Sequence, residues 1–409
     1  MKLSDICKYR SEKIDLKNIT ENEYVSTDNM LPNFAGVGNL KSFPNVDRVN
    51  RFYRNDILLS NIRPYFKKMI LADKDSGCSS DVLVIETTSK DVNPRFLYYR
   101  LRQDDFFDYV VLTSKGTKMP RGDKTAIMNF ELDIPELNIQ NKIVRVVESI
   151  NKKIKLNNEI NNNLYELSQK IYSRWFTDFE YPISLNQTYK SNGGSFKEDG
   201  GLVVPVDFRV CNLDEICDCQ NGHAFYKEGY DDSGLMVIDL GNVSLQGNFI
   251  YTNADKYIDR NRIPNEKFIV KKNDLVMIMT DRKATMDLLG KTAKVYEDKE
   301  YALNQRIYRI RPTINVNYVY SFLNSSSTLE KLKGVALGSV QKYVNTNHIN
   351  DLRIVVPSTE IMNEYSKVVD PIFKQMEENI LENRNLEIMR DSLLPKLMNG
   401  EIDLDNIEI

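Results

Sequence analysis

The amino-acid sequence contains an internal duplication, and this feature constrains the fold more than any other. The segment Leu3–Cys7 (LSDIC) returns as Leu213–Cys217 (LDEIC), and Asp56–Ser60 (DILLS) returns as Asp274–Ile278 (DLVMI). Nearer the end of each half, a glycine and a proline recur at the same offset of 222 positions. Matches that keep their order and nearly keep their offset indicate two diverged copies of one unit. The sequence therefore predicts two tandem halves.

In each half the pattern of residues changes once, at a recurring proline, Pro135 or Pro357. Before the proline, short runs of strand-forming residues such as Val82–Ile85 and Val276–Met279 are broken by Gly, Asp and Asn, which is typical of a mixed α/β unit. After the proline, apolar residues recur every three or four positions, which places them on one face of an α-helix. The predicted segments are a first globular domain at 1–138, a long helix at 139–180, a second domain at 181–357, and a second long helix with a C-terminal tail at 358–409.

The two long helices are expected to pack against each other, because each apolar stripe is narrow and the rest of each helix is polar. An antiparallel pair would relate the two copies by a pseudo-two-fold axis. The predicted fold class is therefore α+β, with two mixed α/β domains separated by two long antiparallel helices in a coiled coil. Ser358 is the expected N-cap of the second helix. The predicted seam consists of Ile143, Val147, Ile150, Ile154, Leu164 and Ile171 in the first helix and Tyr365, Val368, Ile372 and Met376 in the second.

Asparagines interrupt both predicted seams. Asn157 and Asn161 fall in the middle of the first stripe, and Asn379 and Asn383 fall in the middle of the second. Asparagine is a poor helix former, so packing must hold such a segment helical. One interpretation is that buried asparagines pair across the seam and set its register. The alternative is that they lie on solvated faces where the helix is kinked or broken.

The residues that common catalytic sites require are scarce. With two histidines in the chain, His223 and His348, a histidine-based triad or a multi-histidine metal site is nearly excluded. Cys211, Cys217 and Cys219 precede His223, but their spacing differs from that of a zinc knuckle, and small buried cysteines are the favoured interpretation. We predict no metal, no cofactor and no catalytic residue.

The composition indicates a folded protein of the cytoplasm. Hydrophobic residues make up 41% of the chain, which excludes a disordered or fibrous class. The five cysteines, an odd number, suggest reduced thiols. No apolar run approaches the roughly 20 residues that span a bilayer, and the N-terminus has no secretory pattern. We therefore expect a cytoplasmic protein without a membrane partner.

The net charge of −3 conceals an uneven distribution. The two globular segments are each close to neutral, whereas residues 358–409 carry an excess of acidic groups. The acidic helix is expected to face protein, and basic loops in the globular segments are candidates for contacts with nucleic acid.

Basic residues gather with aromatic and turn residues in two loops of each globular segment. Such loops suit phosphate contacts through Lys, Arg and backbone N–H groups, and base contacts through Arg, Gln or Asn. A single loop of this kind could equally be an ordinary solvated loop. Because equivalent loops with different sequences occur in both copies, we favour two binding heads with two different targets. The candidate DNA-binding residues are Arg63, Tyr65, Lys67, Lys115, Lys118, Arg121 and Lys124 in the first copy and Arg282, Lys283, Gln341, Lys342 and Tyr343 in the second.

The chain resembles the specificity (S) subunit of type I restriction–modification systems over almost its whole length. The resemblance rests on Asp56–Tyr65, Gly116–Pro120, Asn221–Phe225, Gly338–Lys342 and the terminal Leu393–Ile402, together with the order head, helix, head, helix. It implies two target recognition domains that each read one half of a bipartite double-stranded DNA target. It also implies helices that dock modification (methyltransferase) subunits, two in number, which recruit restriction subunits. The seam helices would then be the docking surface, and the subunit itself would catalyse nothing.

Two other classes of function remain open at this point. The chain could be a two-headed protein-interaction scaffold whose helices serve only as an oligomerisation arm. It could also be a nuclease or methyltransferase with cryptic motifs. A steep salt dependence of duplex binding favours DNA over a protein partner, because phosphate contacts release counterions.

Overall fold

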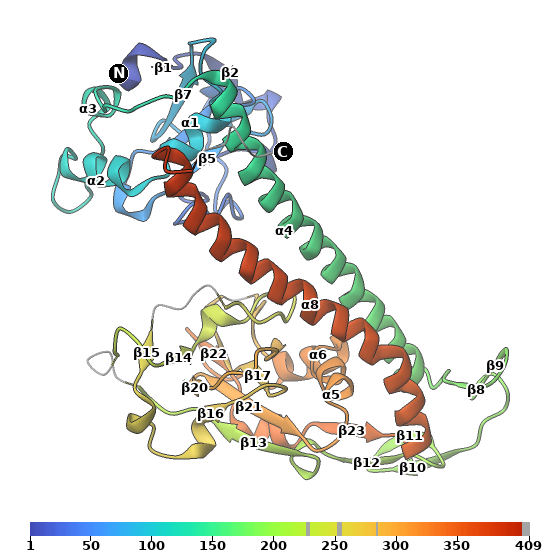
Figure 1. Ribbon diagram of the computed structural model, residues 1–409. Helices are drawn as coiled ribbons and strands as arrows, with labels where there is room; N and C mark the ends of the chain where they lie inside the picture. The colour runs from blue at the N-terminus through green and yellow to red at the C-terminus, as the bar shows by residue number, and fades with distance from the viewer. Residues whose placement is uncertain (226–229, 252–255, 284, 403–409) are drawn as a thin grey trace. The chain divides into compact units, whose positions relative to one another are not determined.

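The chain folds into two compact units, and each contains a globular head and a stretch of both long helices. The first unit combines Met1–Lys152 with Glu387–Ile409, and the second is Lys153–Leu386. The helices α4 (Leu137–Tyr172) and α8 (Thr359–Met398) therefore contribute residues to both units. The computed structural model in Figure 1 describes residues 1–225, 230–251, 256–283 and 285–402, so residues 403–409 of the expected tail lie outside it.

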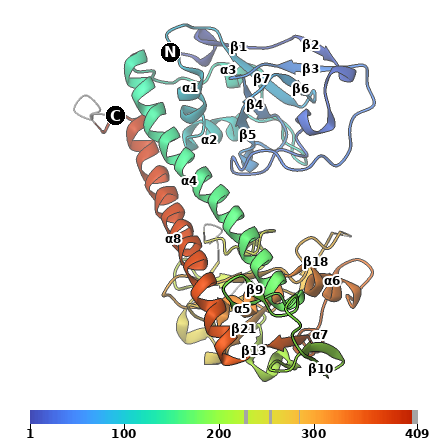
Figure 2. The ribbon, with the colours of Figure 1, turned by 90° about the vertical axis from the view of Figure 1, so that its right-hand side faces the viewer.

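A four-stranded antiparallel sheet with the order β1-β7-β4-β5 forms the centre of the first head (Figure 2). Successive residues of its strand β4 (Ile57–Ser60) point to opposite faces. Ile57 and Leu59 pack on the side of the head helices, and Leu58 packs on the side of a second sheet with the order β2-β3-β6. Burial on both faces explains why this strand is a continuous apolar run. The other elements are β1 (Cys7–Tyr9), β2 (Lys13–Asp15), β3 (Arg48–Phe52), β5 (Met69–Leu71), β6 (Ser76–Cys78), β7 (Val82–Thr87), α1 (Pro94–Arg100), α2 (Asp104–Leu112) and α3 (Lys124–Met128).

The second head is built in the same way around the sheet β13-β21-β17-β19. In β17 (Leu275–Ile278), Leu275 and Met277 pack with residues of the head helices, while Val276 and Ile278 face a second sheet with the order β15-β14-β20-β16. The remaining elements are β8 (Pro182–Ser184), β9 (Gln187–Thr188), β10 (Phe196–Asp199), β11 (Leu202–Pro205), β12 (Arg209–Asn212), β13 (Cys217–Asn221), β14 (Leu235–Ile238), β15 (Tyr257–Ile258), β16 (Ile269–Val270), β18 (Thr280–Asp281), β19 (Thr292–Lys294), β20 (Tyr301–Leu303), β21 (Ile307–Pro312), α5 (Val316–Leu323), α6 (Ser326–Gly334), β22 (Lys342–Tyr343), α7 (Thr346–Asn350) and β23 (Arg353–Val356).

The strand registers confirm the internal repeat. A 3-10 turn precedes β1 at Leu3–Asp5 and precedes β13 at Leu213–Glu215, so the first sequence match is also a structural match. Lys8 lies opposite Glu86 in the first head, and the equivalent pair in the second head is Asp218 opposite Arg311. The cross-strand ion pair is thus retained with its charges exchanged. This exchange of charges shows that the two copies have kept the same strand pairing while individual side chains diverged.

The long helices pack antiparallel in the second unit, and their asparagines pair across the seam. Asn157 Nδ2 donates to Asn383 Oδ1 at 2.9 Å, and Asn379 Nδ2 donates to Asn161 Oδ1 at 2.8 Å. As the residue number of the asparagine in α4 rises, the number of its bonded partner in α8 falls, which shows that the two helices are antiparallel. Asn157 is equivalent to Asn379 in the repeat, and Asn161 is equivalent to Asn383. Each bond is therefore the counterpart of the other, and a pseudo-two-fold axis passes between them. The paired-seam interpretation is confirmed, and all four asparagines are buried.

The same helices also pack together in the first unit. Ile143 and Val147 of α4 form a buried cluster with Leu394 and Leu397 of α8, and Phe96 of α1 belongs to the same cluster. Arg390 of α8 donates to Asn151 Oδ1 of α4 at 3.1 Å, and both residues lie one turn from this cluster in opposite chain directions, as in an antiparallel pair.

The predicted seam residues are buried or partly buried, with one exception. Tyr365 and Met376 are fully buried, but Val368 is 45% exposed. The neighbouring Val369 takes the buried position instead, in a row with Tyr365 and Phe373 on the face of α8 that packs against the rest of the unit. Ile143, Val147 and Ile150 are buried, whereas Ile154, Leu164, Ile171 and Ile372 are partly buried. Ser358 accepts a hydrogen bond from the backbone N–H of Ile361, as expected of an N-cap.

None of the helices in the described ranges is both long enough and apolar enough to cross a membrane.

Candidate nucleic-acid interface

The two polar loops predicted in the second copy lie side by side in the second head. Strand β18 pairs with β22, so that Thr280 lies opposite Tyr343 and Asp281 lies opposite Lys342. The second loop closes on itself through reciprocal backbone bonds between Leu337 and Tyr343, at 2.8 and 3.0 Å. The structure thus brings together the residues that the sequence places about sixty positions apart.

The first head repeats this arrangement at equivalent positions. Ile62 bridges Arg121, and Lys115 and Arg121 exchange backbone bonds at 2.8 and 2.9 Å. Gly116 and its counterpart Gly338 both have positive φ, at 96° and 90°, so each loop turns at a residue that tolerates the left-handed region. The recurring glycine therefore marks the same turn in both copies.

A third segment joins the two loops in each head, and no motif in the sequence pointed to it. Met279 N–H donates to Arg306 O at 3.2 Å in the second head, and Asn61 N–H donates to Asp81 O at 2.9 Å in the first. We call residues 61–68, 80–81 and 115–124 the first tip, and residues 279–283, 304–306 and 337–346 the second tip. The one signal in the sequence was that this segment immediately precedes the central strand β7 or β21.

Three of the predicted cations in the first tip are paired with carboxylates. Lys115 forms an ion pair with Asp123, Arg121 bonds Asp81 at 3.0 Å, and Lys67 bonds Asp104. The pairing with Lys115, together with backbone N–H donors of α3, lowers the pKa of Asp123. These pairs hold the loops but partly neutralise the charge they would offer a phosphate.

The other predicted cations of the first tip have no acidic partner within the described part of the chain. These are Arg63, Lys118 and Lys124, all exposed. Arg63 begins a turn of 3-10 helix, Pro64–Phe66, with φ at 51°. Tyr65 in that turn is 49% exposed. The turn thus presents an unpaired guanidinium beside an exposed aromatic ring.

The predicted residues of the second tip are mostly accessible. Arg282 and Lys283 are exposed, and only a long 3.9 Å contact links Lys283 to Asp287. Gln341 and Lys342 are partly buried, and Tyr343 is 41% exposed. Asp281 is buried and accepts backbone N–H bonds from Lys283 and Leu288 at 2.8 Å each, which fixes the loop that carries the two cations.

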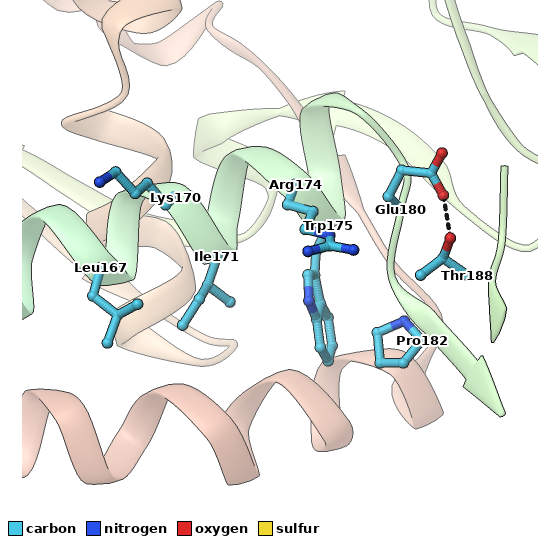
Figure 3. A pocket seen from close by; sticks show the side chains of 8 residues that line it. All are labelled: Leu167, Lys170, Ile171, Arg174, Trp175, Glu180, Pro182 and Thr188. Carbon is cyan, nitrogen blue, oxygen red and sulfur yellow. Dashed lines mark hydrogen bonds between the residues drawn. The ribbon is translucent and has the colours of Figure 1, made fainter. Parts of the chain in front are cut away.

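An open cavity of about 400 Å³ lies elsewhere in the second unit, where α4 ends (Figure 3). Leu167 and Ile171 line it from α4, and the π-helical turn Ser173–Thr177 adds Arg174 and Trp175. Leu167 is 46% exposed, whereas Trp175 is 7% exposed. The cavity therefore combines apolar side chains with a cationic group.

The hairpin of β8 and β9 closes one side of this cavity. Glu180 accepts hydrogen bonds from Thr188 and Ser191, and these bonds lower the pKa of the Glu180 carboxyl. Figure 3 shows the Glu180–Thr188 bond beside Pro182. The Glu180 carboxylate thus joins the two flanks of the hairpin, and the backbone N–H of Glu180 donates to Arg174 O at the end of the helix at 2.8 Å.

The cysteines near His223 lie in strands β12 and β13 of the second head and do not form a cluster of metal ligands. Cys211 and Cys217 are buried, and burial raises the pKa of the Cys219 thiol to about 12. Groups of three or more His, Cys, Asp or Glu side chains able to hold a metal ion do not occur among the described residues.

Comparison with known proteins places this arrangement in a family. The model of the type I restriction modification DNA specificity domain matches residues 1–166 and 205–387. The two matched segments correspond to the two copies of the repeat, each with a head and part of the long helix that follows it.

Similar proteins extend over nearly the full chain. The type I restriction enzyme HindI specificity subunit of Haemophilus influenzae is 25% identical, with 98% of both chains covered. The MjaVIII specificity subunit of Methanocaldococcus jannaschii is 23% identical over 86% of this chain and 80% of its own. The solved type I restriction–modification S subunit from M. genitalium shares the fold, with a TM-score of 0.53, 15% identity and coverage of 97% of this chain and 95% of that one. Because the family model matches most of the duplicated chain, this protein belongs to the specificity subunits of type I restriction–modification systems.

Proposed function

We propose that each head of this specificity subunit reads one half of a bipartite duplex DNA target, and that the chain itself catalyses nothing. The observation that carries the proposal is the pair of tips. The backbone bonds of the two tips are equivalent, but the side chains differ at almost every position that faces outward. A shared backbone arrangement with different side chains suits two domains that recognise two different DNA sequences.

The accessible charges support DNA as the ligand. Arg63 and Lys118 in the first tip and Arg282 and Lys342 in the second have no acidic partner among the described residues. Unpaired Lys and Arg beside Tyr65 or Tyr343 suit phosphate contacts that set the register of a protein on a duplex.

Methylation mapping tests this proposal directly. The chain is co-expressed with the modification subunits of its system, and methylated positions in the host DNA are mapped. We expect one motif with two specific parts and an unspecified spacer. Exchange of residues 337–346 for the loop of another specificity subunit is expected to change one part and leave the other intact. A single continuous motif would contradict the assignment of one half-site to each head.

We further propose that α4 and α8 dock two modification subunits, which bring restriction subunits to the complex. The pseudo-two-fold seam of the second unit relates the outward faces of the two helices. The cavity beside Leu167, with Lys170 and Arg174 at its border, would accept an apolar side chain flanked by acidic groups. Such a helix-in-groove contact is a common mode of protein recognition.

The alternative is a protein-interaction scaffold without DNA recognition. Duplex binding that falls steeply between low and high salt supports the DNA reader, because released counterions make phosphate contacts salt-dependent. Binding to a protein partner alone, with little dependence on salt, would support the scaffold. Turnover of DNA or methyl donor by the purified chain would contradict the non-catalytic role.

A further inference from the structure

A polar cavity of about 350 Å³ opens within the second tip. Backbone bonds from three directions fix its walls: His223 N–H donates to Leu303 O at 2.9 Å, Met279 N–H to Arg306 O at 3.2 Å, and Val344 N–H to Met279 O at 3.0 Å. Segments that are far apart in sequence are thereby held in place before any ligand arrives. Its lining residues are Asn221, Met279, Thr280, Gln305, Tyr343, Val344, Asn345 and Thr346.

A glycine allows one of these segments to come close enough. A Cβ atom at Gly222 would lie 1.8 Å from the carbonyl oxygen of Asn304. Any other residue would push the end of β13 away from the turn between β20 and β21. The close approach brings Asn221 and Gln305 to the same cavity.

The amide groups of the cavity are largely unused by the protein. In the described ranges, the side chains of Asn221 and Gln305 have no hydrogen-bond partner, and both residues are exposed. Asn345 accepts a bond from His348 N–H at 3.0 Å through Oδ1 as the cap of α7, which leaves its Nδ2 group available. A side-chain amide offers a donor and an acceptor in one plane, a pattern that matches the N6 and N7 edge of adenine.

The charge around the cavity favours a base edge over other polar ligands. Among the residues that the structure describes, no carboxylate lines the cavity. Lys342 and Tyr343 stand in β22 at its border, and Arg282 follows β18 on the same loop pair. Cations at the border suit the phosphates, and neutral amides at the centre suit the bases between them.

On the basis of the proposed function, we infer that Gln305 is a specificity-determining residue of the second head and reads an adenine in the major groove, with Asn221 and Asn345 beside it. The turn that carries Gln305 is held by its own bond to Asn304, since Gln305 N–H donates to Asn304 Oδ1 at 2.8 Å. The backbone N–H of Gln305 is therefore occupied, whereas its side-chain amide keeps its hydrogen-bonding groups for a ligand.

The first head lacks this arrangement at equivalent positions. Ser80 and Asp81 stand where the second head has Gln305 and Arg306, and Asp81 is tied to Arg121. Asp123 stands where the second head has Asn345 and caps α3. The amide cluster is thus a property of the second head alone, so its substitution is expected to act on one half-site.

The test uses methylation mapping of the full complex of the chain with its modification subunits. Gln305→Ala is expected to reduce discrimination at one base pair of one half-site by about tenfold or more. Gln305→Glu is expected to shift the preferred base at that position from adenine to cytosine, because a carboxylate accepts from the cytosine N4 amino group. Gln246→Ala, at an exposed glutamine of the second head outside the cavity lining, is the matched control and is expected to keep the wild-type motif.

The outcomes distinguish a failure of the inference on Gln305 from a failure of the proposed function. If wild type yields a bipartite motif and neither Gln305 variant alters either half, the inference on Gln305 is wrong while the proposed function stands. A uniform loss of methylation by Gln305→Glu without a change of base also overturns it. If wild type yields no bipartite motif, the proposed function itself fails. Unchanged fluorescence of Trp175, the single tryptophan of the chain, verifies that each variant is folded.

Discussion

Asn379 of α8 donates through Nδ2 to Oδ1 of Asn161 in α4 at 2.8 Å, in the buried seam of the second unit. Gln375 donates to Asn379 Oδ1 at 3.1 Å, and Asn161 Nδ2 donates to Met376 O at 3.3 Å. The pair is therefore satisfied on both sides. A slip of either helix would separate the two amides inside an apolar seam, where an unpaired polar group is costly. The pair sets the register of the helices.

Breaking this pair should destabilise the second unit. Asn161→Ala is expected to lower the free energy of unfolding by about 1–3 kcal/mol, because it leaves Asn379 Nδ2 buried without its acceptor. Asn161→Leu combined with Asn379→Leu should be close to neutral in stability, since both polar partners are removed together. Urea unfolding followed by Trp175 fluorescence measures both, because the Trp175 ring lies 5.7 Å from that of Tyr365 in α8.

The exposed neighbour Asn162 supplies the control for the seam. Asn162→Ala should be neutral or slightly stabilising, because alanine is the better helix former. A loss of stability in Asn162→Ala equal to that in Asn161→Ala would contradict the assignment of the loss to the paired amide.

Unpaired cations of the first tip should matter more than paired ones. Arg63→Ala and Lys118→Ala are each expected to weaken binding of the first half-site and to reduce the dependence of log K on log salt by about one unit. Lys115→Ala should have a smaller effect, because Asp123 already neutralises that ammonium group. Fluorescence-anisotropy titrations of the full complex with duplexes mutated in one half-site provide the measurement.

Lys90, an exposed lysine of the first head outside the tip, is the matched control for these substitutions. Lys90→Ala should bind both half-sites like wild type. Equal weakening of both half-sites by Arg63→Ala would refute its assignment to the first.

Lengthening both helices should lengthen the spacer of the DNA target. Seven residues inserted after Lys152 in α4 and seven after Leu386 in α8 add about two turns, or about 10 Å, to each helix. We expect the preferred spacer to grow by about three base pairs, at about 3.4 Å for each. Methylation mapping measures the spacer directly, and a spacer that stays the same would contradict the prediction that the length of the helices sets it.

The cavity at the end of α4 should be required for assembly and not for folding. Leu167→Glu places a negative charge beside the apolar wall of the cavity and is expected to weaken binding of the modification subunit at least tenfold. Leu112→Glu, at an 83% exposed leucine of the first head, is the matched control. Size-exclusion chromatography with purified modification subunit measures both, and equal binding by the two variants would contradict docking at this cavity.

Lys294 should make the stability of the second unit depend on pH. Burial lowers the pKa of this lysine to about 8, although Glu377 and Asp370 oppose the shift. Its Nζ donates to Asn317 Oδ1 at 2.9 Å. Because the folded state releases the proton at a lower pH than the unfolded state, Lys294 should add about 1–2 kcal/mol to the free energy of unfolding between pH 7.5 and 9.5, against the opposite contribution of buried thiols such as Cys219.

Two substitutions isolate this effect. Lys294→Met should remove this contribution, because methionine has no proton to release. Lys331→Met, at an exposed lysine of the same unit, should keep it. Urea unfolding at the two pH values, followed by Trp175 fluorescence, makes the comparison. An identical change of stability with pH in Lys294→Met and in wild type would contradict the contribution of Lys294.

Features that arise from local periodicity could be predicted from the sequence. The three- and four-residue spacing of apolar residues predicts α4 and α8, and Ser358 predicts where α8 begins. The recurring Gly116 and Gly338 predict equivalent turns, because their backbone conformation is a property of the residue itself. The pairing of the seam asparagines could be proposed on the same ground, since it depends on helical faces and on the symmetry of the repeat.

The tertiary structure alone decided which side chains meet. Val369 rather than Val368 is buried because the choice depends on what packs against α8, and both residues fit the periodicity. Gln305 lies beside Asn221 and Asn345 only because β13, β21 and β22 bring together segments separated by about forty or more residues. Long-range backbone bonds set such contacts, and no local spacing encodes them. The duplicated chain by itself thus determined two heads and two helices, and the fold determined which residues meet at the tip of each head.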